Sequence, residues 1–415
     1  MRLTRLWRHA DFMRLWLGQT VSEFGSVITR DALPLVAVLT LQATPTQMGV
    51  LAALSMLPAF LIGLPAGAWV DRVRRRPIMI ASDLLRAALL ASIPAAFVLG
   101  ALRIEQLYLV AMLAGALDIL FDTAYQSYLP SLVERENLVE GNRKLGATES
   151  IAEIGGSALA GTLVQILSAP MTILIDAVSF LASVVSVALI RKPEPRPQPS
   201  GQPNLRREIV VGLGFVARQP ILRALVGATA MRAFFGNFYA ALYSLYALRE
   251  LKLTPAILGL LIASGGLGSL FGALFTERAA RRFGLGQTLV GGMLVSGLLG
   301  LFIPLAGGPL WMAVAMLFVP QFFGDAVSTV FSINATSLRQ TITPDHFLGR
   351  MNATMNFVLG GVATVGVLVG GLLGDVLGLR PAVWIAAIGS GLAAIWLIAS
   401  PVRSLRSMPQ ASVNE

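Results

Sequence analysis

The chain has 415 residues, of which 55% are hydrophobic and 13% charged, and its mean hydropathy is +0.72. Because an ordinary soluble domain has roughly 25% charged residues, this composition excludes a soluble protein and indicates an integral membrane protein. The chain has no cysteine and only two histidines, His9 and His346, which excludes disulfides and argues against a metal site.

Twelve apolar stretches are each long enough to cross a bilayer as a helix, which takes about 20 residues. They cover approximately residues 15–41, 48–70, 78–100, 107–128, 145–167, 171–190, 221–248, 256–276, 285–305, 310–333, 357–377 and 381–400. The sequence therefore predicts an all-α, polytopic membrane protein with twelve transmembrane helices.

A dense charge cluster separates the second and third stretches. Asp71 ends the second stretch, and Arg72, Arg74, Arg75 and Arg76 follow it. Such a turn stays on the cytoplasmic side by the positive-inside rule. On this orientation four of the 32 Lys and Arg residues lie outside and three within spans, so the other 25 are cytoplasmic. The net charge of +10 is then a topology signal rather than a nucleic-acid-binding patch. Both termini are expected in the cytoplasm, with the chain multi-pass in the inner (plasma) membrane.

The centre of the chain changes character after the sixth stretch. Residues 191–204 alternate proline with polar residues, a composition typical of an extended linker. Residues 205–218 fit an amphipathic helix on the inner membrane surface. Four parts follow from this division. They are a six-helix bundle over 1–191, a cytoplasmic linker with an interfacial helix over 192–219, a second six-helix bundle over 220–402, and a disordered cytoplasmic tail over 403–415.

An internal repeat relates the two predicted bundles. The charge cluster recurs after the eighth stretch at a constant shift of 206, for example 277 minus 71. Its second copy consists of Glu277, Arg278, Arg281 and Arg282, which correspond to Asp71, Arg72, Arg75 and Arg76. Similar shifts relate Asp118 to Asp325 and Gly156 to Gly366. The halves are therefore one structural unit duplicated in the same orientation.

The cluster resembles the loop between helices 2 and 3 of the major facilitator superfamily, on the pattern Gly-x-x-x-Asp-Arg-x-Gly-Arg-Arg. The matching residues are Gly67, Asp71, Arg72, Arg75 and Arg76, whereas Arg74 replaces the second glycine of the motif. The tracts 125–130, 176–180 and 339–350 resemble the branch that contains enterobactin-type siderophore exporters and macrolide efflux pumps. This resemblance implies a monomeric secondary transporter without cofactor, exporting small amphipathic molecules by alternating access and driven by proton entry.

The resemblance assigns the charge cluster and its second copy to a conformational gate. Its members are Gly67, Asp71, Arg72, Arg75, Arg76, Glu277, Arg278, Arg281 and Arg282. Asp71 is expected to latch onto the first turn of the eleventh span, because a carboxylate can accept from exposed helix N–H groups. Asp122 is a candidate partner for Arg75. The alternative is a cluster that only sets topology.

A second set of charged residues lies within predicted spans, where charge is costly and functional by default. The candidates for substrate or proton binding are Glu23, Arg30, Asp31, Asp118, Arg232 and Asp325. Arg30 alternatively neutralises Glu23 or Asp31. For Glu23, Asp31 and Arg232 the alternative is a structural ion-pair network. Asp118 and Asp325 recur at equivalent positions of the two halves, which shared ancestry of the fold explains as well as chemistry does. Proton coupling rests on the resemblance, although the fourth span lacks the arginine that many proton-coupled drug exporters carry there.

Two other functions stay open. One is a lysophospholipid or other lipid transporter, and the other is a membrane sensor without transport. An enzyme is not expected, because the chain has no phosphate-binding Gly-x-x-x-x-Gly-Lys loop and no convincing Ser-His-Asp set.

Overall fold

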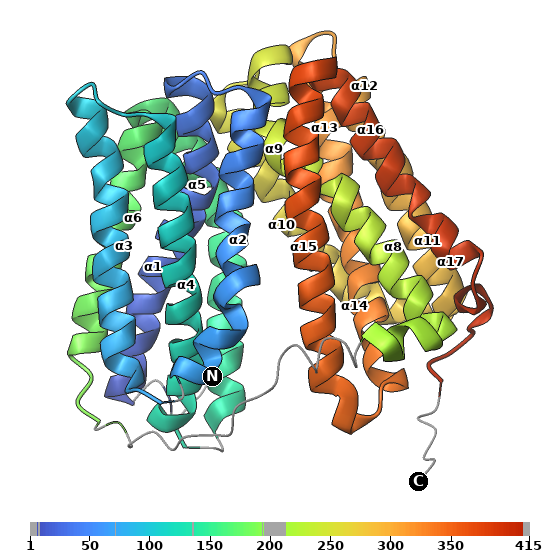
Figure 1. Cartoon of the computed structure of the whole chain (residues 1–415), viewed down its shortest axis with the longest axis horizontal. Coiled ribbons are helices and arrows are strands. Elements are labelled where there is room, and N and C mark those ends of the chain that lie inside the picture. Colours follow the sequence, from blue (N-terminus) through green and yellow to red (C-terminus); the bar gives the residue numbers. More distant parts are fainter. Residues whose placement is uncertain are drawn as a thin grey trace. The chain divides into compact units, whose positions relative to one another are not determined.

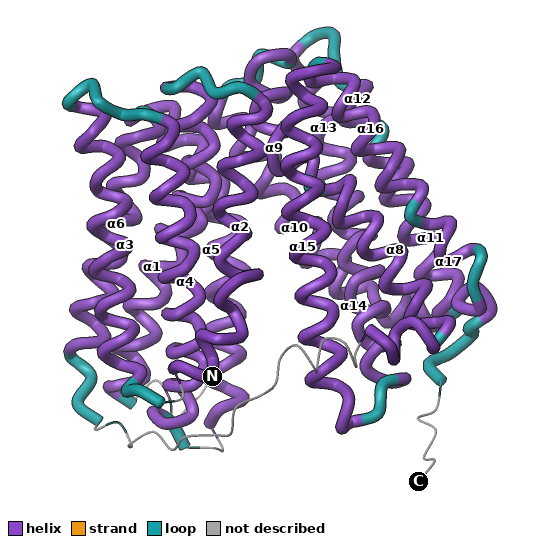
Figure 2. Tube along the Cα trace, in the orientation of Figure 1, coloured by secondary structure: helices purple, strands orange, loops and turns teal. Residues whose placement is uncertain are grey.

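The computed structural model of the chain describes residues 6, 9–70, 72–134, 137–192, 194 and 213–409. These residues form helices joined by short loops, without a strand (Figures 1 and 2). They divide into two compact units. Unit 1 comprises Met1–Ala43, Leu54–Gln202 and Thr254–Ala263, and unit 2 comprises Thr44–Ala53, Pro203–Leu253 and Ser264–Glu415.

Apart from residues 44–53, which belong to unit 2, the helices of the first half of the chain make up most of unit 1. They are α1 (Ala10–Leu35) with the π-helical segment η2 (Val36–Thr40), α2 (Pro45–Val70), α3 (Arg75–Val98), α4 (Ile104–Leu132), α5 (Leu138–Leu167) and α6 (Ala169–Ala188). Helix α1 packs between α5 and α6, and α3 packs against α4 and α6.

Unit 2 is built from the helices of the second half. They are α8 (Pro220–Gly236), α9 (Phe238–Leu245), η4 (Tyr246–Glu250), α10 (Pro255–Phe283), α11 (Leu285–Gly300), α12 (Phe302–Leu305), α13 (Leu310–Val319), η5 (Pro320–Gly324), α14 (Asp325–Ile342), α15 (Asp345–Leu377), α16 (Leu379–Leu392), α17 (Ala394–Ile398) and the 3-10 turn η6 (Pro401–Ser404). Helix α8 packs against α15 and α16, and α11 packs against α14 and α16.

The prediction of an all-α polytopic membrane protein is confirmed. Among the described residues, ten helical runs are long and apolar enough to cross a membrane. The other two predicted spans correspond to α1 with η2, which contains five charged residues, and to α8, α9 and η4, where the helix is interrupted at Asn237. All backbone polar groups in a bilayer must be satisfied within the chain, and helices achieve this.

Several helices are longer than the predicted spans, because their polar ends continue beyond the apolar stretches. Helix α15 begins at Asp345 rather than near residue 357, and α5 begins at Leu138 rather than at residue 145. Disorder from residue 403 is wrong for the first tail residues, because Leu405 and Arg406 accept backbone hydrogen bonds from the first turn of α11. In the linker, residues 213–218 are helical. Residues 195–212 of the linker and residues 410–415 of the tail lie outside the described residues.

The duplication inferred from the sequence recurs in the backbone. The π-helical segments η2 and η4 begin at residues 36 and 246, which differ by 210. The left-handed residues Gln42 and Lys252 follow them at the same shift. Side-chain contacts repeat as well, because Gly25 faces Ser179 in unit 1 and Gly236 faces Ser390 in unit 2.

In each unit, a helix segment from the other half of the chain crosses a helix of that unit at a pair of glycines that brings the backbones together. In unit 2, a methyl group on Gly371 of α15 would lie 2.6 Å from the carbonyl oxygen of Pro45 and 3.0 Å from Cα of Gly49, both in α2. In unit 1, a methyl group on Gly259 of α10 would lie 2.9 Å from Cα of Gly161 in α5. Such small residues allow close helix approach in membranes. They explain why segments 44–53 and 254–263 belong to the unit opposite to the rest of their helices.

Replacing Gly371 by valine is expected to destabilise unit 2 by about 1–3 kcal/mol, because the added atoms overpack the crossing. Gly360→Val in the same helix is the matched control, since a methyl group there would meet nothing within 4 Å. Thermal unfolding of both purified variants in detergent checks this. Equal melting temperatures for the two variants would show that the crossing tolerates side chains.

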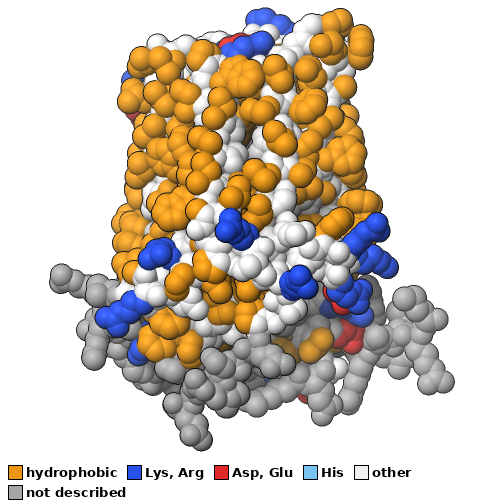
Figure 3. All heavy atoms as spheres, turned by 90° about the vertical axis from the view of Figure 1, so that its right-hand side faces the viewer, with side chains coloured by type: hydrophobic (Ala, Val, Ile, Leu, Met, Phe, Trp, Pro, Cys, Tyr) orange, Lys and Arg blue, Asp and Glu red, His pale blue; other side chains and the backbone are white. Residues whose placement is uncertain are grey.

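Figure 3 shows the face formed by α11, α16 and α17 of unit 2. Apolar side chains cover most of this face, and Lys and Arg side chains gather toward its lower end. A surface of this kind is typical of a lipid-facing wall with a basic rim.

Candidate acidic cavity and charged networks

Unit 1 contains a cavity of about 570 Å³ between α1, α4 and α5. Its wall carries three carboxylates, one from each helix: Glu23 of α1, Asp122 of α4 and Glu149 of α5. No lysine or arginine lines it, and within the described chain none of the three carboxylates forms an ion pair. Glu23 lies in the electrostatic field of both other carboxylates. A cleft lined by one sign of charge concentrates ions of the opposite sign.

The same cavity has apolar and aromatic walls. Tyr125 of α4 stacks on Phe121 with 6.1 Å between ring centroids, and the side chains of Leu129 and Leu145 complete this side. Gln126 and Asn142 add neutral hydrogen-bonding groups. A site with an apolar wall and a few polar groups is suited to a small amphipathic ligand. Three carboxylates in one wall favour a cation over an anion at this place.

The predicted pair of Arg30 and Asp31 lies in a separate network on α1 and α5. The Arg30 guanidinium donates to both oxygens of Glu153, at 2.7 and 2.9 Å, and to Asp31 at 3.2 Å. Arg30 therefore neutralises Asp31, as one of the two sequence-based alternatives had it, and not Glu23. This leaves Glu23 available to the cavity.

A third network is buried between α3, α4 and α6. The Arg86 guanidinium binds both Asp83 of its own helix and Asp118 of α4. It lies between the rings of Phe121 and Phe180, at 4.6 and 4.1 Å from their centroids. The Asp83 side chain is 0% exposed, whereas that of Asp118 is 49% exposed. Asp83 and Arg86 are three residues apart on α3 and neutralise each other, and Asp118 is a second partner of Arg86.

The corresponding region of unit 2 is nearly neutral. Arg232 of α8 donates to the hydroxyl groups of Ser296 at 3.4 Å and Ser328 at 2.5 Å, and Asp325 is its electrostatic neighbour. Asp325 of α14 lies against Gly265 of α10. Arg232, the predicted counter-charge, therefore has its two serine partners and its neighbouring acid within unit 2.

The charge cluster that follows α2 is held by a residue that sequence analysis did not single out. The backbone N–H groups of Arg75 and Arg76, at the start of α3, donate to the two carboxylate oxygens of Glu194, at 2.6 and 3.2 Å. The Arg75 guanidinium lies 3.8 Å from the same carboxylate. The expected pairing of Arg75 with Asp122 is therefore wrong, because Glu194 occupies that place and Asp122 lines the cavity.

The remaining gate residues are less constrained. Asp71 lies outside the described residues, so its latch remains a prediction. Arg72 is exposed, and a methyl group on Gly67 would meet nothing within 4 Å. In the second copy, Glu277 and Arg281 form an exposed ion pair at 3.2 Å, while Arg278 and Arg282 lie near the rings of Phe275 and Phe283. Exposed pairs of this kind contribute little stability.

The first turn of α1 is fixed by a related contact outside the predicted span. The Asp11 carboxylate accepts hydrogen bonds from the backbone N–H groups of Arg191 and Lys192, at 3.2 and 3.1 Å, and from Arg14 at 2.6 Å. Partial burial raises the pKa of Asp11, but these hydrogen bonds outweigh it and hold the pKa below its ordinary value. The start of α1 is thereby tied to the segment after α6.

Three functional candidates, Glu149, Glu153 and Glu194, were not among the predicted site residues. Glu149 and Glu153 are four residues apart and so lie on one face of α5, which was the available signal. Glu194 lies six residues beyond the end of α6, and the free N–H groups at the start of α3 were a reason to seek a carboxylate nearby.

Replacing Glu194 by alanine is expected to loosen the first turn of α3, at a cost of about 0.5–2 kcal/mol, the range for a lost helix N-terminal cap. The amides of Arg75 and Arg76 should then exchange hydrogen faster, whereas Glu194→Gln, which keeps an acceptor, should protect them partly. Glu105→Ala at the opposite end of the α3–α4 pair is the control. Unchanged exchange at both amides would show that Glu194 does not cap α3.

Comparisons with known proteins place the chain among membrane transporters. Residues 5–415 match the model of a family described as transmembrane secretion effector. The chain is 28% identical over 394 residues to the multidrug efflux pump Tap of Mycobacterium tuberculosis, covering 91% of this chain and 90% of Tap. It is 27% identical over 247 residues to macrolide efflux protein A of Streptococcus pyogenes, covering 59% and 60%. The chain spans about half the length of two further relatives, 50% and 51%.

A solved structure shares the fold. A bacterial homologue of the iron transporter ferroportin superposes with a TM-score of 0.74 at 18% identity, over 95% of this chain and 99% of the homologue. At that identity the likeness concerns the fold.

Proposed function

Because the chain belongs to the transmembrane secretion effector family of major facilitator transporters, we propose that it exports small amphipathic cations in exchange for protons. The observation that carries this proposal is the cavity of unit 1, with the carboxylates of Glu23, Asp122 and Glu149 and, among the residues that the structure describes, no basic side chain in its wall. The names of Tap and macrolide efflux protein A support the outward direction.

The negative charge of the cavity favours cations over anions as the class of substrate. Two unit charges about 4 Å apart near a protein surface interact by about 4 kcal/mol at an effective dielectric constant of 20. An amine-bearing drug is therefore attracted by each carboxylate, whereas a polyanionic siderophore is repelled by all three. The apolar wall at Tyr125 and Leu129 takes the hydrophobic part of the molecule.

Proton exchange follows from the same groups. A carboxylate that binds a cation must release it before it takes a proton, so one set of acids can couple outward movement of a cation to inward movement of protons. The inner membrane and a cytoplasmic position for both termini belong to this proposal, since the arginine-rich turns set the orientation.

Inside-out vesicles from cells with and without the protein test the proposal. With respiration making the lumen acidic, the protein should drive uptake of ethidium but not of a polyanionic siderophore or a lysophospholipid, and nigericin, which collapses the pH gradient, should abolish it. Ethidium uptake that persists with nigericin would refute proton coupling. Uptake of the siderophore or of the lipid, without ethidium, would refute the cation assignment.

A further inference from the structure

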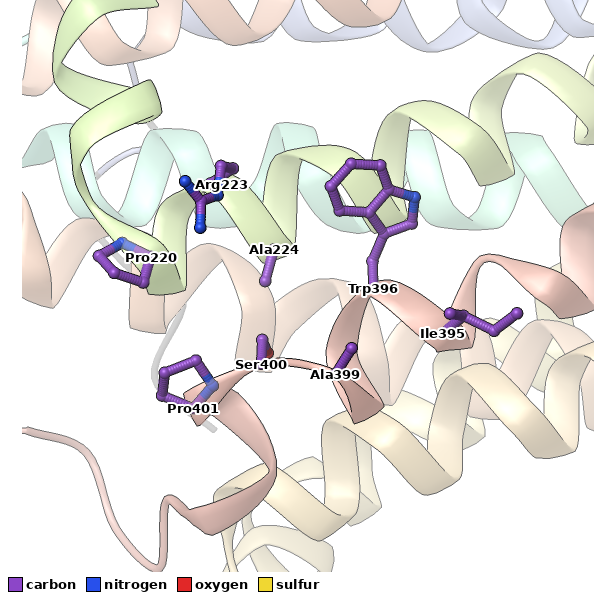
Figure 4. Close-up of a pocket in the computed structure, with 8 residues that line it drawn as sticks. All are labelled: Pro220, Arg223, Ala224, Ile395, Trp396, Ala399, Ser400 and Pro401. Carbon is purple, nitrogen blue, oxygen red and sulfur yellow. The ribbon is translucent and has the colours of Figure 1, made fainter.

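A second pocket, of about 320 Å³, lies on unit 2 between the first turns of α8 and the end of α17 (Figure 4). Its two ends differ in chemistry. Arg223 lies beside Pro220 at the start of α8, and Trp396 and Ile395 lie toward the other end of the pocket. The pocket is thus polar where α8 begins and apolar further along the helix.

The apolar end of the pocket is packed against α8 and is exposed at the protein surface. The Trp396 ring packs on Gly227 of α8, where a methyl group would lie 2.6 Å from two ring atoms. Gly227 is four residues beyond Arg223, so this end lies about 6 Å further along α8. Trp396 is 45% and Ile395 57% exposed, so both present apolar surface outward. Tryptophan side chains near the end of a membrane-spanning helix, as Trp396 is in the run that ends at Ile398, are typical of the membrane interface.

The polar end carries an uncompensated cation. Arg223 is exposed, no carboxylate lines the pocket, and within the described residues Arg223 forms no ion pair. The arginine guanidinium matches the geometry of a phosphate group and can bind it with two hydrogen bonds. Basic side chains at the membrane surface also attract anionic lipids.

We propose that this pocket binds one anionic phospholipid, with its phosphate on Arg223 and an acyl chain along Trp396 and Ile395. The order of the two ends along α8 matches the order of headgroup and chain in a bilayer leaflet. A free anion would occupy only the Arg223 end and leave the apolar wall exposed. The bound lipid fills the gap between the start of α8 and the end of α17, and so ties the first and last helices of unit 2 together.

Native mass spectrometry of the full-length protein in detergent, with added phosphatidylglycerol, phosphatidylcholine or inorganic phosphate, tests the proposal. Wild type should retain phosphatidylglycerol over phosphatidylcholine, and Arg223→Gln should lower that retention about fivefold, the effect of one basic side chain at an anionic surface. Ala399→Phe should lower it too, because Ala399 is exposed and the larger side chain fills the pocket without entering the core.

Arg406→Gln is the matched control, since it removes an exposed arginine that follows η6 and does not line the pocket. It should retain phosphatidylglycerol as wild type does. Equal retention of both lipids, displacement of the lipid by inorganic phosphate, or unchanged retention in Arg223→Gln or Ala399→Phe would overturn the proposal.

Discussion

Arg86→Met is expected to cost unit 1 about 3–5 kcal/mol of stability, because it leaves a buried carboxylate without its cation. Asp83 is fully buried and bound by Arg86, so the substitution leaves its charge without a cationic partner. The two phenylalanine rings that hold the guanidinium would also lose their partner. We expect a markedly lower folded yield and a lower melting temperature in detergent.

The second substitution in this test is Asp83→Asn, combined with Arg86→Met. Removing both buried charges should recover much of the lost stability, since a buried ion pair replaced as a whole is often neutral. Arg86→Lys should be intermediate, because lysine keeps the charge but not the planar group between the rings. Arg103→Gln, an exposed arginine before α4, serves as the control. If the double variant were no more stable than Arg86→Met, the pairing of Arg86 with Asp83 would not explain the loss.

Asp122→Asn is expected to weaken binding of a lipophilic cation about 10–100-fold, the effect of losing one charge-assisted contact of about 1.5–3 kcal/mol. Glu23→Gln and Glu149→Gln should act in the same direction, because all three carboxylates line one cavity. Glu105→Gln is the matched control, as an exposed acid at the start of α4 that does not line the cavity. Binding is measured by fluorescence of ethidium on the purified variants.

Ethidium binding by these variants also tests whether Asp122 itself takes part in substrate binding. If Asp122→Asn bound ethidium as wild type does, Asp122 would have no part in substrate binding and the cavity would need another explanation. The control must stay within about twofold of wild type, since exposed charges more than a Debye length away are largely screened.

The fold was predictable because long apolar stretches and cytoplasmic arginines report directly on spans and sides. The contact between Asp83 and Arg86 is local, since residues three apart on one helix are neighbours. Contacts between helices were not predictable in this way. Asp118 reaches Arg86 from α4, and Glu194 reaches Arg75 from beyond α6, through packing that a single sequence does not encode locally.

The two acids of α5 illustrate the same limit. Glu149 and Glu153 share a helical face, but they differ by about 6 Å in depth. One lines the cavity and the other binds Arg30. Spacing alone predicts that both acids share a face of α5. Which of them binds Arg30 depends on the position of Arg30 along α1.

The most direct test of the account compares a lipophilic cation with an uncharged molecule of the same shape. Binding of tetraphenylphosphonium and of tetraphenylmethane to the purified protein is measured for wild type and for Glu23→Gln/Asp122→Asn/Glu149→Gln. If the three carboxylates select the cation, wild type should prefer it, and the triple variant should lose this preference while keeping its affinity for the neutral molecule. A triple variant that still prefers the cation would contradict the account.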